Sequence, residues 1–237
     1  MKDGKLHIQF ACTANQGRSP VAEAIARRAI KELGLEDRLD VSSSGTQAES
    51  INNRNYDWNG MLYVLDKGLD YNSEAEDESK AEPGKGSPIY TPTEKDLVRS
   101  VISRRVTEDH YNSSEELREI IDSLIRKTAV ALSSYEHEQR GIYLREQGLE
   151  LGETGKPTVA DETIDLFLAM DPRNAGRARE ILKGLPAVVT TLHEFVGEEK
   201  PVENAWGHAL PSIYKEMYSR LQAYTENAVR KAAQHNI

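Results

Sequence analysis

The stretch of sequence that decides the fold is LHIQFACTANQGRSP, residues 6–20. Apolar and polar residues alternate at its start, which is typical of a strand, and Pro20 opens a run to Leu33 with apolar residues at helical spacing. The loop between them contains Cys12, the only cysteine in the chain, and Arg18 six residues later. The sequence therefore predicts a strand, a tight loop and a helix, with these two side chains at the turn.

A loop in this position is suited to binding an anion. Several backbone N–H groups can turn towards one point, which the positive end of the helix dipole also faces, so the concavity favours a dianion such as phosphate. The planar guanidinium of Arg18 can bind two phosphate oxygens at once, with Cys12 below the phosphorus. Donors that bind phosphate also stabilise a thiolate, so we expect Cys12 to be a nucleophile at neutral pH.

The loop resembles that of the low-molecular-weight protein tyrosine phosphatases, which reads Cys, two residues, Asn, two residues, Arg, Ser, Pro. Two further segments are similar to this family in the same order. Residues 41–46 look like its second strand and Ser-x-Gly-Thr turn, and residues 164–171 look like its third strand with a Met-Asp end. The loop positions that match are Cys12, Asn15, Arg18, Ser19 and Pro20.

The resemblance implies an α/β fold with a doubly wound, four-stranded parallel sheet in the order 2-1-3-4. The strands are expected near residues 6–11, 39–43, 164–170 and 187–191, with a final helix over 210–234. Ligands of such folds bind at the carboxyl ends of the strands. Cys12, Ser43 and Asp171 would therefore lie at one edge.

Length is the main departure from the family. The chain has 237 residues, and a single domain of this class needs only about two thirds of that length. We expect one domain, residues 1–237, with an insertion at about 50–140 that is partly loop and partly helical. Within it, residues 72–88 are expected to form a loop, and helices are expected over 93–106 and from 114 to about 135. Residues 143–150 are expected to be the helix end that follows the second strand.

The resemblance also implies site residues and a reaction. Ser19 would donate to the thiolate, while Asn15 and Ser43 would hold the shape of the loop. Cys12 would attack phosphorus, and water would hydrolyse the phosphocysteine, with the developing charge held by loop N–H groups and Arg18. Neither a metal nor a cofactor is expected. The residues expected to bind the phosphate are Thr13, Ala14, Asn15, Gln16, Gly17 and Ser19.

The family pattern fails at the general acid. The family uses an Asp followed by Pro before the last helix, whereas this chain has Asn204 and Ala205 at the corresponding place. An amide cannot donate a proton in that way. The candidates, in order, are Glu203, Asp171 and His208, although an Asp before a proline is more often a helix cap.

Other substitutions leave the loop shape and the specificity open. Ala14 stands where the family has Gly, and a positive φ there would cost about 1 kcal/mol or more. The polar Gln16 does not indicate a preferred substrate. The aromatic wall of the family pocket is absent from its usual place, and Tyr56, Trp58 or Trp206 would have to supply it.

Composition excludes several classes of partner. The net charge of −9 disfavours nucleic-acid binding, and no apolar stretch approaches the length of a membrane span. A single cysteine excludes an intrachain disulfide, and the absence of a signal peptide makes the cytoplasm the expected compartment. The expected partner is a phosphorylated protein or a small phosphomonoester, and the sequence does not indicate the oligomeric state.

Three functions fit these residues. The first is a cysteine-dependent phosphatase acting on phosphotyrosine or a related phosphomonoester. The second is a pseudophosphatase that binds phosphate or phosphoproteins, with Asn204 in place of the acid. The third is an arsenate reductase, which would depend on external thiols because Cys12 is the only cysteine.

Overall fold

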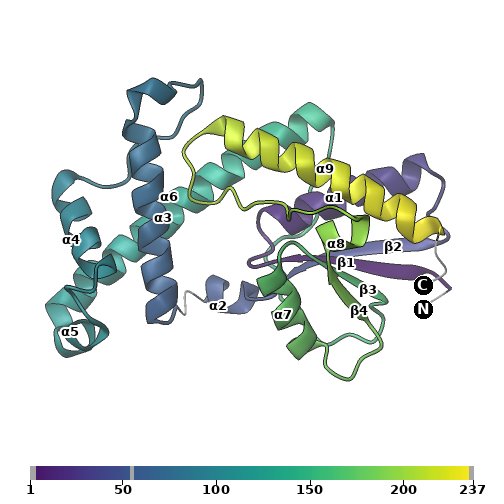
Figure 1. Cartoon of the computed structure of the whole chain (residues 1–237), viewed down its shortest axis with the longest axis horizontal. Coiled ribbons are helices and arrows are strands. Elements are labelled where there is room, and N and C mark those ends of the chain that lie inside the picture. The colour runs from purple at the N-terminus through teal and green to yellow at the C-terminus, as the bar shows by residue number, and fades with distance from the viewer. Residues whose placement is uncertain (1–3, 54–55, 235–237) are drawn as a thin grey trace. The chain divides into compact units, whose positions relative to one another are not determined.

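The computed structural model describes residues 4–53 and 56–234. Four parallel strands form one sheet in the order β2-β1-β3-β4 (Figure 1), which confirms the expected fold class. Cys12 pairs with Gly45, and Ala11 pairs with Ala169, so the carboxyl ends of three strands lie at one edge. The strands are β1 (Leu6–Cys12), β2 (Leu39–Gly45), β3 (Leu166–Ala169) and β4 (Val188–Thr191).

The chain divides into two compact units. Of the described residues, the first unit contains 4–53, 140–204 and 216–234, and the second contains 56–139 and 205–215. Helices of the first unit are α1 (Arg18–Glu32), α2 (Ala48–Asn52), α7 (Pro172–Ile181) and α8 (Leu192–Val196). The second unit contains α3 (Trp58–Glu76), η1 (Glu78–Lys80), α4 (Pro92–Ile102) and α5 (Glu108–Ser113). Two helices, α6 (Glu115–Gln147) and α9 (Pro211–Gln234), have residues in both units.

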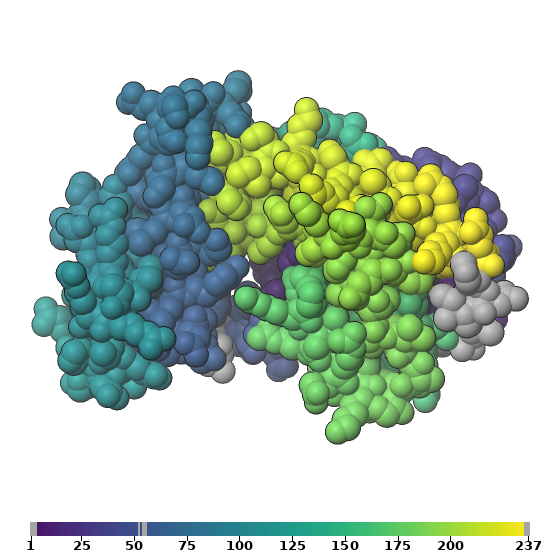
Figure 2. Space-filling view, viewed as in Figure 1, coloured from purple at the N-terminus to yellow at the C-terminus, as the bar shows by residue number. Residues whose placement is uncertain are grey.

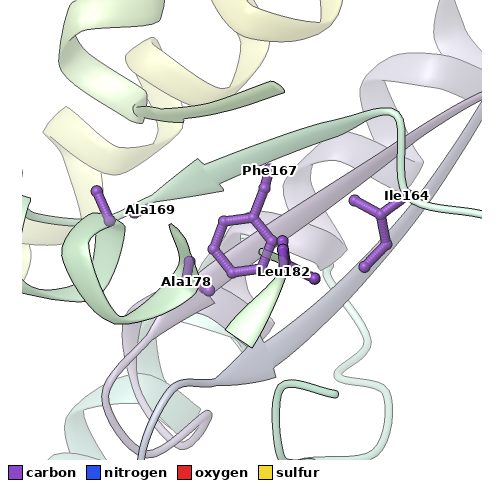
Figure 3. Close-up of a cluster of buried hydrophobic side chains, with 7 residues drawn as sticks. Ile164, Phe167, Ala169, Ala178 and Leu182 are labelled. Carbon is purple, nitrogen blue, oxygen red and sulfur yellow. The ribbon is translucent and has the colours of Figure 1, made fainter. Parts of the chain in front are cut away.

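One face of the sheet packs on α7. Phe167 and Ala169 of β3 point to this face, where they meet Ala178 of α7 and Leu182 (Figure 3). The opposite side of α7 is exposed, as its green surface in the space-filling view shows (Figure 2). The buried small residues therefore bring the start of α7 close to the end of β3.

The other face of the sheet packs on α1. Side chains alternate along a strand, so Leu166 and Leu168 of β3 point away from α7 together with Phe10 of β1. The final helix joins this side, because Arg28 of α1 forms an ion pair of 3.3 Å with Glu226 of α9. Helices thus cover both faces, and α1 begins directly after β1.

The second unit is helical, and part of it differs from the expectation for residues 72–88. The helix α3 continues to Glu76, and η1 follows. Buried Asn72 accepts from the backbone N–H groups of Ile89 and Tyr90 at 2.7 and 2.8 Å, so its single amide orders the chain on both sides of the turn. The one-domain description of the chain, with an insertion at about 50–140, stays a prediction.

The two helices expected near 93–106 and 114–135 correspond to α4 and α6. The second is longer than expected, since α6 continues to Gln147 and includes most of the segment 143–150. Among the described residues, no helix combines the length and the apolar composition needed to span a membrane.

Candidate active site

In the loop between β1 and α1, three carbonyl groups accept hydrogen bonds from the protein, whereas a run of N–H groups finds no acceptor among the described residues. The carbonyls of Cys12 and Thr13 accept from the backbone N–H groups of Thr46 and Gln47, both at 2.9 Å. Within residues 4–53 and 56–234, the N–H groups from Thr13 to Gly17 donate to no protein acceptor. Unpaired N–H groups in a partly buried loop are costly without a ligand or water, so this loop is suited to an oxyanion.

Asn15 fixes the shape of the loop. Its φ of 54° is left-handed, whereas Ala14 has no positive φ, so the strain considered at Ala14 is absent. The side chain is fully buried and donates to Ser19 Oγ at 3.1 Å and to Ser43 Oγ at 2.9 Å. Its Oδ1 accepts from the backbone N–H of Lys156 at 3.0 Å. Asparagine tolerates this backbone conformation better than most residues do.

Close packing against β2 explains the glycine at the end of that strand. A Cβ on Gly45 would lie 2.7 Å from both the carbonyl carbon of Ala14 and the backbone nitrogen of Asn15. Both are backbone atoms and cannot rotate away, so only glycine allows the loop to approach β2 this closely.

A hydroxyl group faces the sulfur of Cys12. Ser19 Oγ donates to Cys12 Sγ at 3.1 Å and also lies 3.1 Å from the carbonyl oxygen of Ser44. Because Asn15 donates to the same Ser19 oxygen, the hydroxyl proton is left for the sulfur or for that carbonyl. A donor in this position stabilises a thiolate.

A buried carboxylate that sequence reasoning missed completes this network. Ser43 Oγ donates to Glu23 Oε2 at 2.6 Å, and Glu23 is only 5% exposed. Its charge is balanced by Arg27 at 2.7 Å and by Lys156 Nζ at 3.5 Å. The one sequence signal is that Glu23 lies four residues after Ser19, on the same face of α1.

Arg18 is anchored by two segments that are far apart in sequence. Its side chain is 5% exposed, donating from Nη1 to the carbonyl oxygen of Val202 at 2.9 Å and from Nη2 to Asp171 Oδ2 at 3.0 Å. A guanidinium has five N–H donors, so these two contacts leave others for an oxyanion.

Asp171 has the contacts of an orienting carboxylate. Besides Arg18, its Oδ2 accepts from Asn174 Nδ2 at 2.7 Å, and its Oδ1 caps α7 by accepting from the backbone N–H of Asn174 at 2.9 Å. These three donors, one of them the Arg18 guanidinium, occupy both carboxylate oxygens, so a role as general acid is not favoured. The helix-cap interpretation of the Asp-Pro pair agrees with this geometry.

The remaining acid candidates lie in different units. Glu203 and Asn204 are exposed and directly follow Val202, whose carbonyl binds Arg18. In contrast, His208 lies in the second unit, where its Nδ1 is 2.7 Å from Glu74 Oε1.

The three aromatic residues considered for a pocket wall also belong to the second unit. There, Trp58 packs on Tyr111 with ring centroids 5.4 Å apart, and Trp206 stacks on Tyr63 at 5.9 Å. For these two tryptophans, such contacts explain burial without a ligand.

Comparison with known proteins finds the same family that the loop sequence resembles. Residues 7–86 match the family model described as "Low molecular weight phosphotyrosine protein phosphatase". A protein of that name from Schizosaccharomyces pombe (strain 972 / ATCC 24843) is 42% identical over 50 residues, which are 21% of this chain and 32% of that protein. The matched segment thus spans about a third of the relative. The resemblance predicted from the loop is confirmed.

Solved structures resemble the whole chain in fold. A low molecular weight protein tyrosine phosphatase from Bacillus subtilis has a TM-score of 0.52 at 18% identity, with 98% of this chain and 100% of that chain covered. A protein tyrosine phosphatase from Entamoeba histolytica has a TM-score of 0.53 at 13% identity, covering 98% and 100%. The YwlE arginine phosphatase from Geobacillus stearothermophilus has a TM-score of 0.50 at 15% identity, covering 97% and 94%. At these identities the similarity shows the fold.

Proposed function

We propose that this chain, a divergent relative of the low molecular weight phosphotyrosine protein phosphatases with a large insertion, is a cysteine-dependent phosphatase. Its substrate would be phosphotyrosine or a related phosphomonoester, in a phosphorylated protein or a small molecule. The observation that carries the proposal is the position of Cys12 Sγ, 3.1 Å from the Ser19 hydroxyl and at the base of a loop of unpaired N–H groups. Location in the cytoplasm remains part of the proposal.

The first chemical step is attack of the Cys12 thiolate on phosphorus. A P–S bond forms while the P–O bond to the leaving group breaks, and the leaving oxygen takes the bonding electrons. The Ser19 hydroxyl stabilises the thiolate before attack. Loop N–H groups and the free donors of Arg18 hold the equatorial oxygens, where charge accumulates in the transition state.

The second step hydrolyses the phosphocysteine. Water attacks phosphorus, the P–S bond breaks, and the sulfur leaves as a thiolate that the Ser19 hydroxyl again stabilises. Orthophosphate is released, so the enzyme returns to its starting state with no net redox change. Both steps use the same hydrogen-bond donors, so a single anion-binding loop stabilises both transition states.

The site lacks the family's usual proton donor to the leaving group. Glu203 is our first candidate, because it is exposed next to the Val202 carbonyl that binds Arg18. Asn204 stands where the family has its acid, and Asp171 is already engaged by Arg18 and Asn174. We therefore expect faster turnover of substrates whose leaving groups need little protonation.

Asn204 at the position of the family acid leaves one alternative for experiment to test, a protein that binds phosphate without hydrolysing it. An arsenate reductase is less favoured, because resolving the Cys12 adduct would need external thiols. The neighbours in fold include an arginine phosphatase, and Gln16 does not discriminate between phosphate esters and phosphoarginine.

Hydrolysis of a series of aryl phosphates tests the proposal. We expect vanadate-sensitive turnover that is lost in Cys12→Ser, with rates that fall as the leaving-group pKa rises. Replacement Asn204→Asp should raise the rate on poor leaving groups and leave the rate on good ones nearly unchanged. Phosphate binding without turnover, together with turnover gained in Asn204→Asp, would instead select the alternative.

A further inference from the structure

Asn174 links three segments at the carboxyl edge of the sheet. It lies in the first turn of α7 and is 1% exposed. Its Nδ2 donates to Asp171 Oδ2 at 2.7 Å, and its Oδ1 accepts from Thr46 Oγ1 at 2.8 Å and from Thr13 Oγ1 at 3.3 Å. One amide therefore joins the end of β3 to the turn after β2 and to the loop after β1.

The chemistry of the partners fixes which way this amide points. An ionised carboxylate only accepts hydrogen bonds, so the NH₂ group of Asn174 must face Asp171. The two threonine hydroxyls then donate to Oδ1. A flipped amide would place its oxygen against the carboxylate in a buried site, with the hydroxyls facing an NH₂ group.

At one end, Asn174 fixes the orientation of Arg18. Asp171 Oδ2 accepts from both Asn174 Nδ2 and Arg18 Nη2, at 2.7 and 3.0 Å, while Asp171 Oδ1 accepts from the backbone N–H of Asn174. Both carboxylate oxygens are thus held, which sets the plane of the carboxylate and with it the direction from which Arg18 is bound.

At the other end, Asn174 reaches the nucleophile. The Thr46 residue whose hydroxyl binds Asn174 also donates its backbone N–H to the carbonyl oxygen of Cys12 at 2.9 Å. Thr13, the second hydroxyl partner, directly follows Cys12 in the chain. The Asn174 side chain therefore contacts Asp171, which binds the Arg18 guanidinium, and also the two threonines that adjoin or bind the Cys12 backbone.

We propose that Asn174 is a positioning residue that sets Arg18 and Cys12 relative to each other for phosphoryl transfer. The inference rests on the proposed phosphatase function and adds a residue that touches no substrate. A small misplacement of hydrogen-bond donors weakens their contacts most in the transition state, where charge develops on the phosphoryl oxygens. The loss of Asn174 should therefore lower kcat more than it raises KM.

The replacement Asn174→Asp tests the amide specifically. At neutral pH it places a second carboxylate against Asp171, and kcat should fall about 10- to 100-fold. In acid, one of the two carboxyls becomes protonated, and its O–H can donate to the other as the amide did. The ratio of variant to wild-type kcat should therefore rise as the pH falls below about 5.

Matched variants separate positioning from folding. Thr46→Val keeps the shape and removes one hydroxyl donor to Oδ1, so kcat should fall by less than in Asn174→Asp, with a ratio to wild type that does not depend on pH. Asn59→Asp makes the same chemical change at an exposed site on α3 and should leave kcat unchanged at every pH. Circular dichroism at each pH verifies that every variant is folded. If Asn174→Asp is not folded, Thr46→Val decides: a lowered kcat supports the inference, and a wild-type kcat contradicts it.

Steady-state hydrolysis of an aryl phosphate between pH 4.5 and pH 8 is the experiment, with kcat and KM determined separately. A lower kcat in Asn174→Asp with recovery in acid supports the inference. Wild-type kcat in this variant at pH 7, a deficit that is equal at every pH, or a change confined to KM would overturn it while the phosphatase function stands. An inactive wild-type chain would refute the function first, and the inference with it.

Discussion

Replacing Asn15 by alanine tests how the loop is held. The side chain makes hydrogen bonds to Ser19, Ser43 and the backbone N–H of Lys156, all in a fully buried site. At about 1 kcal/mol for each, their loss costs about 3 kcal/mol. Alanine must also adopt the left-handed φ of 54° at this position, which adds about 1 kcal/mol. We expect Asn15→Ala to lower the free energy of unfolding by about 4 kcal/mol.

The two contributions can be measured separately. Asn15→Gly loses the same hydrogen bonds and adopts the left-handed conformation without strain, so it should be about 1 kcal/mol more stable than Asn15→Ala. The assay is urea denaturation followed by far-UV circular dichroism, with equal m-values required for the comparison. The reasoning is refuted if Asn15→Ala loses less than about 1 kcal/mol, or if glycine is no better than alanine.

Ser19→Ala should reduce kcat for an aryl phosphate about tenfold or more, because the thiolate loses its hydroxyl donor; an unchanged kcat would remove the role given to that contact. In Gly45→Ala the new Cβ would lie 2.7 Å from loop backbone atoms, so thermal denaturation should show that the free energy of unfolding falls by about 1–3 kcal/mol. In Gly176→Ala, on α7, the new Cβ has open space, and the free energy of unfolding should rise by about 1 kcal/mol. Equal effects of the two replacements would contradict the close packing at Gly45. Burial raises the pKa of Tyr90 to about 12, above its value near 10 in the unfolded chain, so the stability from this neutral phenol is present below pH 10 and is lost as the pH rises towards 12. Denaturation titrations at several alkaline pH values should show this slope, and Tyr90→Phe should reduce it.

The loop and the sheet could be predicted because their signals are local in sequence. Cys12, Asn15 and Arg18 lie within seven residues, and the strand before them and the helix after them have clear periodicity. The strand order followed from the resemblance and is confirmed by the structure. Roles of Glu23 and Asn174 could not be found in this way, because they depend on partners that folding brings together from distant strand ends.

Two other differences have physical causes. The scarcity of apolar residues in 72–88 predicted a loop over the whole segment, but α3 continues to Glu76 within it. The buried amide of Asn72 accepts from two backbone N–H groups there, which stabilises a segment that has few apolar contacts. Positive φ was considered at Ala14 because the family has glycine there, whereas the turn places it at Asn15, whose side chain the network already holds.

The most direct test of the account is to trap the covalent intermediate. The protein is mixed with an aryl phosphate carrying a radioactive phosphoryl group, quenched with acid within one turnover, and digested for peptide mass spectrometry. We predict one labelled phosphoryl group on the sulfur of Cys12, at a level that follows the burst of released phenol. Turnover without label on Cys12, or label at another residue, would contradict the account.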